Sequence, residues 1–369
     1  MQPLIERIGQ RLPGWKGRML NRAGRLTLVT SVLSSMPTYH LIVFPLAVWA
    51  RKQIDKIRRS FLWKGDENAN GGHCLVNWPT VCMPKDLGGL GVPNLEKIGR
   101  ALRLRWLWQE WVHDSKPWVG TTLSCNDLDR LLFNASTSIT IGNGNKARFW
   151  HHNWLDGEAP RYLASHLFQL VSQKNRMVCR ELQNGNWIRS LRTRITTSVQ
   201  IQEFVALWFR IQEVQLTPDV QDSIVWRWTT DGNYSTRSAY NIQFQGSHCK
   251  FQADLIWKAR AENKCKIHAW VLMHDKILTA DNLQKRGWPH HEHCVLCNGP
   301  LETGLHLSLL CPFAKSVWSQ VLSRGNFDVQ LPQQDPQCLA TWWEDLASKV
   351  PKQERRTFNG VLIYVVWNL

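Results

Sequence analysis

Four side chains in the C-terminal third of the sequence have the types and the spacing of a metal site. Cys294 and Cys297 are separated by two residues, His306 follows after eight more, and Cys311 after another four. Three thiolates and one imidazole make a complete tetrahedral ligand set for zinc. Because no position is left open for water or substrate, the pattern predicts structural Zn²⁺ and not a catalytic metal. The alternative is a chance cluster of buried thiols.

Three further histidines, His290, His291 and His293, lie just upstream and could compete as ligands. His293 is adjacent to Cys294, so the two side chains do not easily join one chelate, and we expect all three histidines to be exposed. The predicted cluster lies between two expected helices. Metal binding should therefore join their ends and supply much of the local folding free energy.

The composition is that of a large, basic chain. It has 369 residues, of which 43% are hydrophobic and 20% charged, enough for two or three domains. Lys and Arg number 45 against 29 Asp and Glu, which gives a net charge of +16 and a pI near 9.6. This balance predicts polyanionic partners, nucleic acid before anionic membrane. The alternative is a basic surface without a specific ligand.

The sequence carries no signal for export or membrane insertion. The N-terminus lacks the apolar segment of a secretory signal, and no run approaches the roughly 18–20 apolar residues of a membrane span. Of the ten cysteines, only Cys294 and Cys297 are closely paired. This pattern fits a reducing compartment, so we expect an intracellular protein, nuclear or cytoplasmic.

The first 64 residues are the most basic stretch. Apolar spacing predicts a helix over residues 18–35, ended by Pro37, and a second helix over residues 45–62. The cations on one face of the second helix are either simply solvated or follow a phosphate backbone. We predict nucleic-acid contacts from six side chains: Arg18, Arg22, Arg25, Lys52, Lys56 and Arg59.

The middle of the chain combines turns, a tryptophan-rich helix and short strands. Residues 88–91 read Gly-Gly-Leu-Gly, but neither the P-loop nor the Rossmann spacing follows, so a tight turn is expected. A helix over residues 94–113 should be buried on two sides. Asn143-Gly144 and Asp231-Gly232 predict two β-hairpins, and Ser235 or Thr236 should cap a short helix.

Helical spacing returns in the C-terminal part, over residues 264–286 and from residue 312. A Pro/Gln-rich linker is expected over residues 331–337. The last predicted helix begins near residue 353 and is still running at residue 369, which suggests truncation.

Several motifs in order resemble one known family. Around the metal cluster, residues 257–318 are similar to the zinc-binding domain of plant reverse transcriptase-like proteins from non-LTR retrotransposons of the LINE type. Upstream segments are similar to the thumb region after the polymerase palm and to the spacer that follows it. The motifs lie at residues 23–28, 34–39, 61–63, 88–91, 142–144, 222–228, 232–235, 278–283 and 286–288.

The resemblance implies a mainly α fold with small β-hairpins (α+β): a helical thumb-like segment, a mixed spacer and a zinc-stapled helical domain. We place these at residues 1–115, 116–222 and 223–325, with a linker and truncated helix at 326–369. The sequence departs from the family at Asn21, usually Ser, and at His152, usually Asp. Glu262 and His268 replace a proline and an aromatic residue.

No Asp-Asp pair occurs, so the metal motif of the polymerase is missing, and two-metal chemistry needs clustered carboxylates. The sequence therefore predicts a non-catalytic C-terminal fragment of a retrotransposon reverse transcriptase that binds RNA or DNA and structural zinc. The missing polymerase or ribonuclease H regions would be further partners. The alternatives are a protein-interaction module that exposes the tryptophan-rich helix, and a decayed retroelement product without a selected role.

Overall fold

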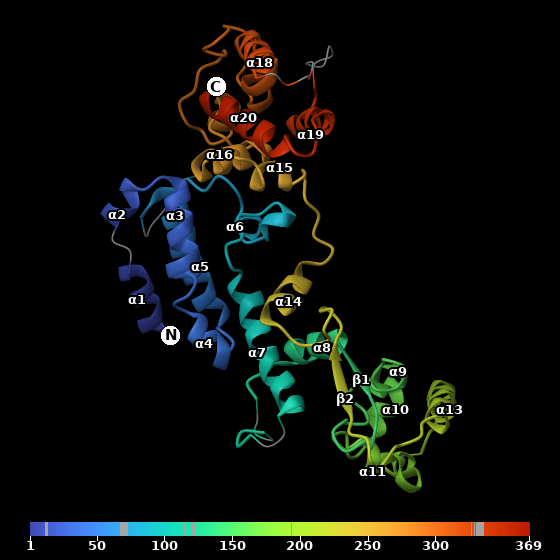
Figure 1. Ribbon diagram of the computed structural model, residues 1–369. Helices are drawn as coiled ribbons and strands as arrows, with labels where there is room; N and C mark the ends of the chain where they lie inside the picture. Colours follow the sequence, from blue (N-terminus) through green and yellow to red (C-terminus); the bar gives the residue numbers. More distant parts are fainter. Residues whose placement is uncertain are drawn as a thin grey trace. The chain divides into compact units, whose positions relative to one another are not determined.

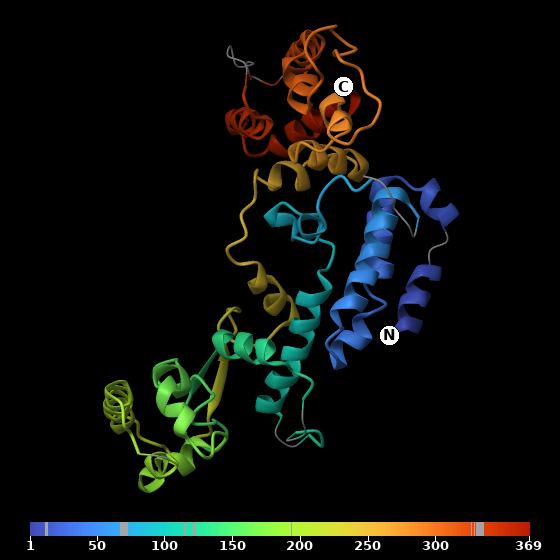
Figure 2. The ribbon, with the colours of Figure 1, turned by 180° about the vertical axis from the view of Figure 1, so that it is seen from behind.

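A computed structural model describes residues 1–11, 14–66, 73–113, 116–119, 121, 123–192, 194–325, 327, 329 and 336–369. It is mainly helical, as predicted, and the described residues form one two-stranded sheet (Figures 1 and 2). Within these residues, no helix is long and apolar enough to cross a membrane. Most of the predicted linker lies outside the described residues.

The chain divides into two compact units. The first comprises Met1–His40, Leu46–Glu96 and Phe244–Leu369, and the second Leu41–Pro45 and Lys97–Gln243. The four sequence regions predicted above stay a prediction.

The first unit begins with short helices that pack on one long helix. The long helix is α5 (Val48–Lys64), and the others are α1 (Gln2–Arg11), α2 (Gly14–Met19), α3 (Arg22–Leu28) and the π-helical turn η1 (Val29–Leu33). The predicted helix over residues 18–35 starts later, because the Asn21 side chain accepts the Gly24 N–H at 3.0 Å and caps α3. Serine and asparagine are both good N-cap residues, so this departure from the family is conservative.

A buried arginine fixes α5 in the first unit. Arg58 is fully buried, and it donates to Asp55 Oδ1 at 2.7 Å and to Ser34 Oγ at 2.8 Å. It also donates to the Pro93 carbonyl at 2.6 Å. Sequence periodicity does not predict this side chain as a core residue, since arginine is rarely fully buried unless it is paired.

The glycine motif forms the expected turn. Gly88 (φ 79°) ends the short 3₁₀ helix η2 (Lys85–Leu87), and Gly91 is also left-handed (φ 72°). A Cβ atom at Gly89 would lie 2.0 Å from the Met83 carbonyl oxygen, so only glycine fits there. Preceding this turn is the short helix α6 (Trp78–Val81).

The C-terminal part of the first unit is a helical group around buried tryptophans, among them Trp270, Trp318 and Trp343. α20 packs against α15, α16 and α19. The elements are α15 (Asp254–Trp257), α16 (Asn263–Met273), α17 (Ala280–Gln284), η5 (His306–Leu310), α18 (Pro312–Arg324), α19 (Leu339–Lys349) and α20 (Arg355–Asn368).

The helical pattern predicted over residues 264–286 is interrupted between α16 and α17. Asp275 takes a left-handed conformation (φ 55°). The Asn282 side chain donates to the Asp275 and Ile277 carbonyls at 3.2 and 3.0 Å. These side-chain bonds compete with continued helix, and periodicity alone does not reveal such competition.

The second unit joins α7 to a smaller helical region through the sheet. From Lys97 on, α7 (Leu95–Val112) packs with α8 (Asp127–Ser136) around a cluster that includes Leu104, Trp108, Phe133 and Trp226. The other elements are α4 (Thr38–Val43), α9 (Pro160–Leu163), α10 (Ser165–Leu170), α11 (Val178–Leu182), η3 (Gln183–Gly185), α12 (Asn186–Arg189), α13 (Ser198–Gln212), α14 (Thr236–Asn241) and η4 (Ile242–Phe244), some of which reach the unit boundary.

The strand pairing differs from the predicted hairpins. β1 (Thr137–Thr140) pairs antiparallel with β2 (Ser223–Trp226), and Thr137 lies opposite Trp226. The Asn143-Gly144 and Asp231-Gly232 turns form, but neither connects two paired strands of the sheet. The sheet therefore pairs a segment before Asn143 with a segment before Asp231, and the partners predicted for both were wrong. By contrast, Ser235 caps α14 as predicted, accepting the Ser238 N–H.

A buried carboxylate explains why the first turn cannot close a hairpin. Asp222 Oδ1 accepts the backbone N–H groups of Gly142 and Gly144, and Oδ2 those of Lys146 and Ala147, at 2.8–3.0 Å. The loop therefore wraps around this carboxylate and not around a facing strand.

Asp222→Asn is expected to destabilise the second unit by about 2 kcal/mol, because the amide NH₂ faces two N–H groups that then lack an acceptor. Hydrogen exchange at the backbone amides of residues 142–147 measures this loss of stability. The control, Asp219→Asn at an exposed position of the same loop, should behave as wild type. Equal protection in both variants would contradict this role for Asp222.

Candidate metal centre

The four predicted ligands come together at the start of α18. Their ligand atoms, three Sγ atoms and one histidine nitrogen, all lie within 4.8 Å of one another. Cys294, His306 and Cys311 are buried, and Cys297 is half-buried. No other group of three or more such side chains is found among the described residues.

The separations fit a single zinc ion. Cys297 Sγ and His306 Nε2 are 3.4 Å apart. Tetrahedral zinc, with Zn–S near 2.3 Å and Zn–N near 2.0–2.1 Å, places a sulfur and a nitrogen roughly 3.6 Å apart. The donor set is three soft sulfurs and one imidazole, and softness of this kind selects zinc over magnesium or calcium.

Two loops hold the ligands, and each is fixed by backbone hydrogen bonds. In the first, Asn298 N–H donates to the Cys294 carbonyl at 2.8 Å, and Asn298 is left-handed (φ 51°). Cys294 N–H in turn donates to the Pro300 carbonyl. A Cβ atom at Gly299 would lie 3.1 Å from Cys297 Sγ, so the chain passes close to this sulfur.

The second loop is the π-helical turn η5, which begins at His306 and is followed directly by Cys311. Cys311 N–H donates to the His306 carbonyl at 2.8 Å, which closes the turn. His306 N–H donates to Thr303 Oγ1 at 3.0 Å. Cys311 is also the N-cap residue of α18, where the helix dipole stabilises a thiolate.

A tryptophan ties this turn to the helix that follows. The buried Trp318 on α18 donates from Nε1 to the Ser308 carbonyl at 2.7 Å. Sequence reasoning identified the four ligands but missed this support. The competing histidines, His290, His291 and His293, are all exposed, as expected.

The site is suited to stabilising the local fold and not to catalysis. Three of the four ligands are buried, and the ligand set is complete without water. The site would join the 294–297 loop to η5 and α18, so metal binding and local folding are linked.

The six predicted nucleic-acid contacts lie in the first unit, and their surroundings differ. Lys52 and Lys56 are exposed on α5, and Arg59 on the same helix is half-buried. Arg25 donates to the Gly17 and Trp63 carbonyls at 2.8 and 3.2 Å, and it therefore supports the fold.

The remaining two arginines make weaker contacts. Arg22 lies over the Trp63 ring at 6.0 Å. Arg18 is largely exposed, with one long ion pair of 3.7 Å to Asp66. The lysines of α5 are thus the best placed of the six for an external polyanion, and the six contacts stay a prediction.

Comparison with known proteins bears on the region that holds the site. Residues 234–318, which include all four ligands, match the family described as zinc-binding in reverse transcriptase. The match supports a retroelement-related protein. An Arabidopsis thaliana protein named "Putative ribonuclease H protein" is 26% identical over 352 residues, covering 86% of this chain and 55% of that protein. The chain thus spans about half the length of this relative. Together the two matches point to plant retrotransposons.

One departure from the family has a structural explanation in the second unit. His152 Nδ1 accepts the Arg148 backbone N–H at 2.9 Å, a bond that an aspartate oxygen would also accept. Burial and the nearby Arg148 lower the pKa of His152 to about 3, so its ring is neutral at pH 7 and Nδ1 stays an acceptor.

Proposed function

We propose that this chain is a non-catalytic, nucleic-acid-binding part of a LINE-type reverse transcriptase, built around one structural zinc ion. The observation that carries the proposal is the Cys₃His cluster within the region matched to the zinc-binding family of reverse transcriptases. The net charge of +16 supports a polyanionic partner.

Charge on α5 supports the choice of surface. Lys52 and Lys56 are one helical turn apart and exposed, so both can reach phosphates on the same side of the helix. If six cations neutralise six phosphates of a duplex, the slope of log affinity against log salt should be about −5. Fluorescence anisotropy with a labelled duplex measures it. A slope near zero would contradict an electrostatic surface.

Lys56→Gln should reduce the magnitude of this slope by about 1, because one phosphate contact is lost. The matched control is Lys352→Gln, an exposed lysine ahead of α20 that the proposal does not use. If both variants changed the slope equally, the binding would be a property of net charge and not of α5.

The proposal includes the absence of catalysis. Nucleotidyl transfer and ribonuclease H cleavage need clustered carboxylates that hold two metal ions. Among the described residues, the one group suited to a metal has three sulfurs and no carboxylate. We expect no primer extension and no cleavage of an RNA–DNA hybrid in magnesium. Metal-dependent turnover by the purified chain would contradict the proposal.

The interaction-module alternative receives no support from the helix on which it was predicted. Leu104, Leu107 and Trp108 of α7 are buried, and Trp106 Nε1 donates to the Ile42 carbonyl. Large exposed apolar side chains in this helix are limited, within the described residues, to Val112.

A further inference from the structure

A cavity in the first unit lies outside the metal centre. Its volume is about 640 Å³, within the roughly 300–1,000 Å³ of typical ligand pockets. Five separate parts of the unit line it: Arg59 on α5, residues 74–80, Met83 with Leu87 and Gly88, residues 248–250, and the turn after α16 with His274 and Lys276.

The charged side chains that line this cavity are all cationic. Arg59, Lys250 and Lys276 contribute positive charge, with His248 and His274 beside them, and no aspartate or glutamate lines the cavity. Among the described residues, no carboxylate pairs with any of the three cations. Unpaired cations of one sign around a concave surface focus the field and attract an anion.

The three cations line one cavity although they are far apart in sequence. Burial lowers the pKa of the His274 ring, the hydrogen bond to the Gly88 carbonyl opposes this shift, and the charges of Lys250 and Lys276 add to the lowering. Arg59 acts likewise on the Cys74 thiol, lowering a pKa that burial raises. Both affected groups line the cavity, so each of the three cations lies close to a group on the cavity wall.

One backbone carbonyl at the cavity wall is already hydrogen-bonded. The Gly88 carbonyl, which would repel an anion, accepts Trp270 Nε1–H at 2.7 Å and lies 3.4 Å from His274 Nε2. A Cβ atom at Gly88 would meet Cys249 Sγ at 2.4 Å, so this wall is closely packed. Apolar side chains, including Val76 and Met83, complete the lining and could contact a sugar or base.

We propose that this cavity binds the phosphate monoester of a nucleotide, held by Arg59, Lys250 and Lys276. A phosphate monoester carries about −1.5 to −2 charges at pH 7 and three acceptor oxygens, which matches a cluster of three cations. The planar guanidinium of Arg59 can bind two oxygens at once, and the lysines act as point charges. The phosphate could come from a free nucleotide or from a strand end. Binding of a strand end rests on the proposed function, whereas binding of a free nucleotide does not depend on it.

The test uses the full chain and calorimetric titration with adenosine 5′-monophosphate and with adenosine. We expect the monophosphate to bind and adenosine to bind at least about tenfold more weakly, since charged hydrogen bonds are lost. Lys250→Glu and Lys276→Glu should each weaken monophosphate binding by about tenfold or more. Both lysines are exposed, so the fold should persist, and Lys250→Gln provides a milder variant. The control is Lys352→Glu, at an exposed lysine outside both the cavity and α5, with affinity unchanged.

Short RNA with a 5′-phosphate or a 5′-hydroxyl distinguishes the sources. A preference for the 5′-phosphate that disappears in Lys276→Glu assigns the site to a strand end. Monophosphate binding without that preference assigns it to a free nucleotide. Equal affinity for monophosphate and adenosine, or equal weakening by Lys352→Glu, would overturn the proposal. If RNA failed to bind while the monophosphate still required Lys250 and Lys276, the proposed function would fail and the cavity would stand.

Discussion

Replacing Cys297 with serine should reduce the zinc content of the purified chain from one ion to nearly none. Serine is a poor ligand at neutral pH, and the three remaining side chains would leave an open position. Structural zinc contributes roughly 10–16 kcal/mol of apparent binding free energy in zinc-finger peptides, and that energy is folding energy. We therefore expect loss of ordered structure over residues 255–325.

Elemental analysis measures the metal, and hydrogen exchange over residues 255–325 measures the structure. Cys338→Ser is the matched control, because Cys338 is an exposed, free cysteine outside the cluster. It should retain one zinc ion and full protection. A Cys297→Ser protein that kept both its metal and its protected helices would show that the cluster is incidental.

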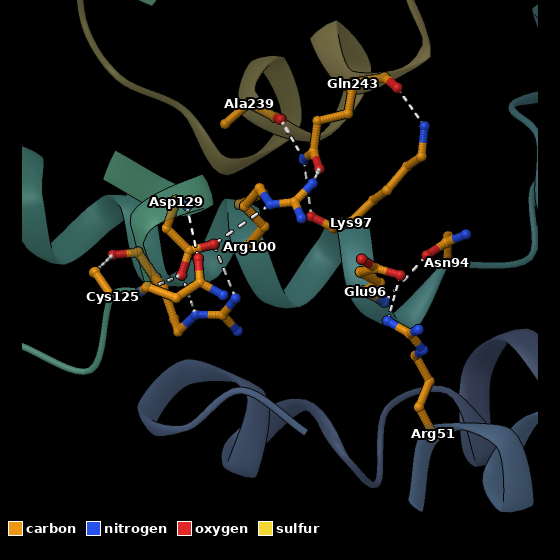
Figure 3. A network of polar contacts seen from close by, with 12 residues as sticks. Arg51, Asn94, Glu96, Lys97, Arg100, Cys125, Asp129, Ala239 and Gln243 are labelled. Carbon is orange, nitrogen blue, oxygen red and sulfur yellow. Dashed lines mark hydrogen bonds and ion pairs between the residues drawn. The ribbon is translucent and has the colours of Figure 1, made fainter. Parts of the chain in front are cut away.

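Replacing Arg103 with alanine should destabilise the second unit by about 3 kcal/mol or more. Arg103 joins α7 to α8 through Asp129, with Nε–Oδ2 at 2.7 Å and Nη2–Oδ1 at 3.0 Å. Both side chains are buried. Removing one partner of a buried pair leaves an uncompensated charge, which costs roughly 3–5 kcal/mol. We choose the lower end of this range because Arg100 keeps an ion pair with Asp129, drawn as a dashed line in Figure 3. The Arg100 Nε atom lies 3.4 Å from Asp129 Oδ1.

Two further variants isolate the buried charge as the cause. Arg105→Ala changes an exposed arginine on the same helix, and its denaturant midpoint should stay within experimental error of wild type. The double variant Arg103→Met with Asp129→Asn removes both charges, keeps a side-chain oxygen for the Asn126 N–H that Asp129 accepts, and should recover most of the stability. If Arg103→Ala and the double variant were equally unstable, lost packing and not the orphaned carboxylate would be responsible.

Features encoded over short stretches of sequence could be predicted. The four ligands fall within 18 residues, so their spacing alone defines a chelate. Ser235 directly precedes α14, and a serine at that position predicts an N-cap. The mainly helical fold follows from apolar spacing in the same way.

Features that depend on distant residues could not be predicted. β1 and β2 pair across more than eighty residues, and a local turn signal competes with the true pairing. Asp222 looks like one of many polar loop residues, although four backbone N–H groups converge on it. The cations that line the proposed phosphate-binding cavity come from separate parts of the chain. Counting charges along the sequence shows that these residues are present, but it does not show that they line one cavity.

The central claim is that one zinc ion is enclosed by Cys294, Cys297, His306 and Cys311. X-ray absorption spectroscopy at the zinc edge of the purified protein tests it most directly. The account predicts one zinc ion per chain with three sulfurs at about 2.3 Å and one nitrogen at about 2.0–2.1 Å. A protein without bound zinc, or zinc with oxygen ligands in place of these sulfurs, would contradict it.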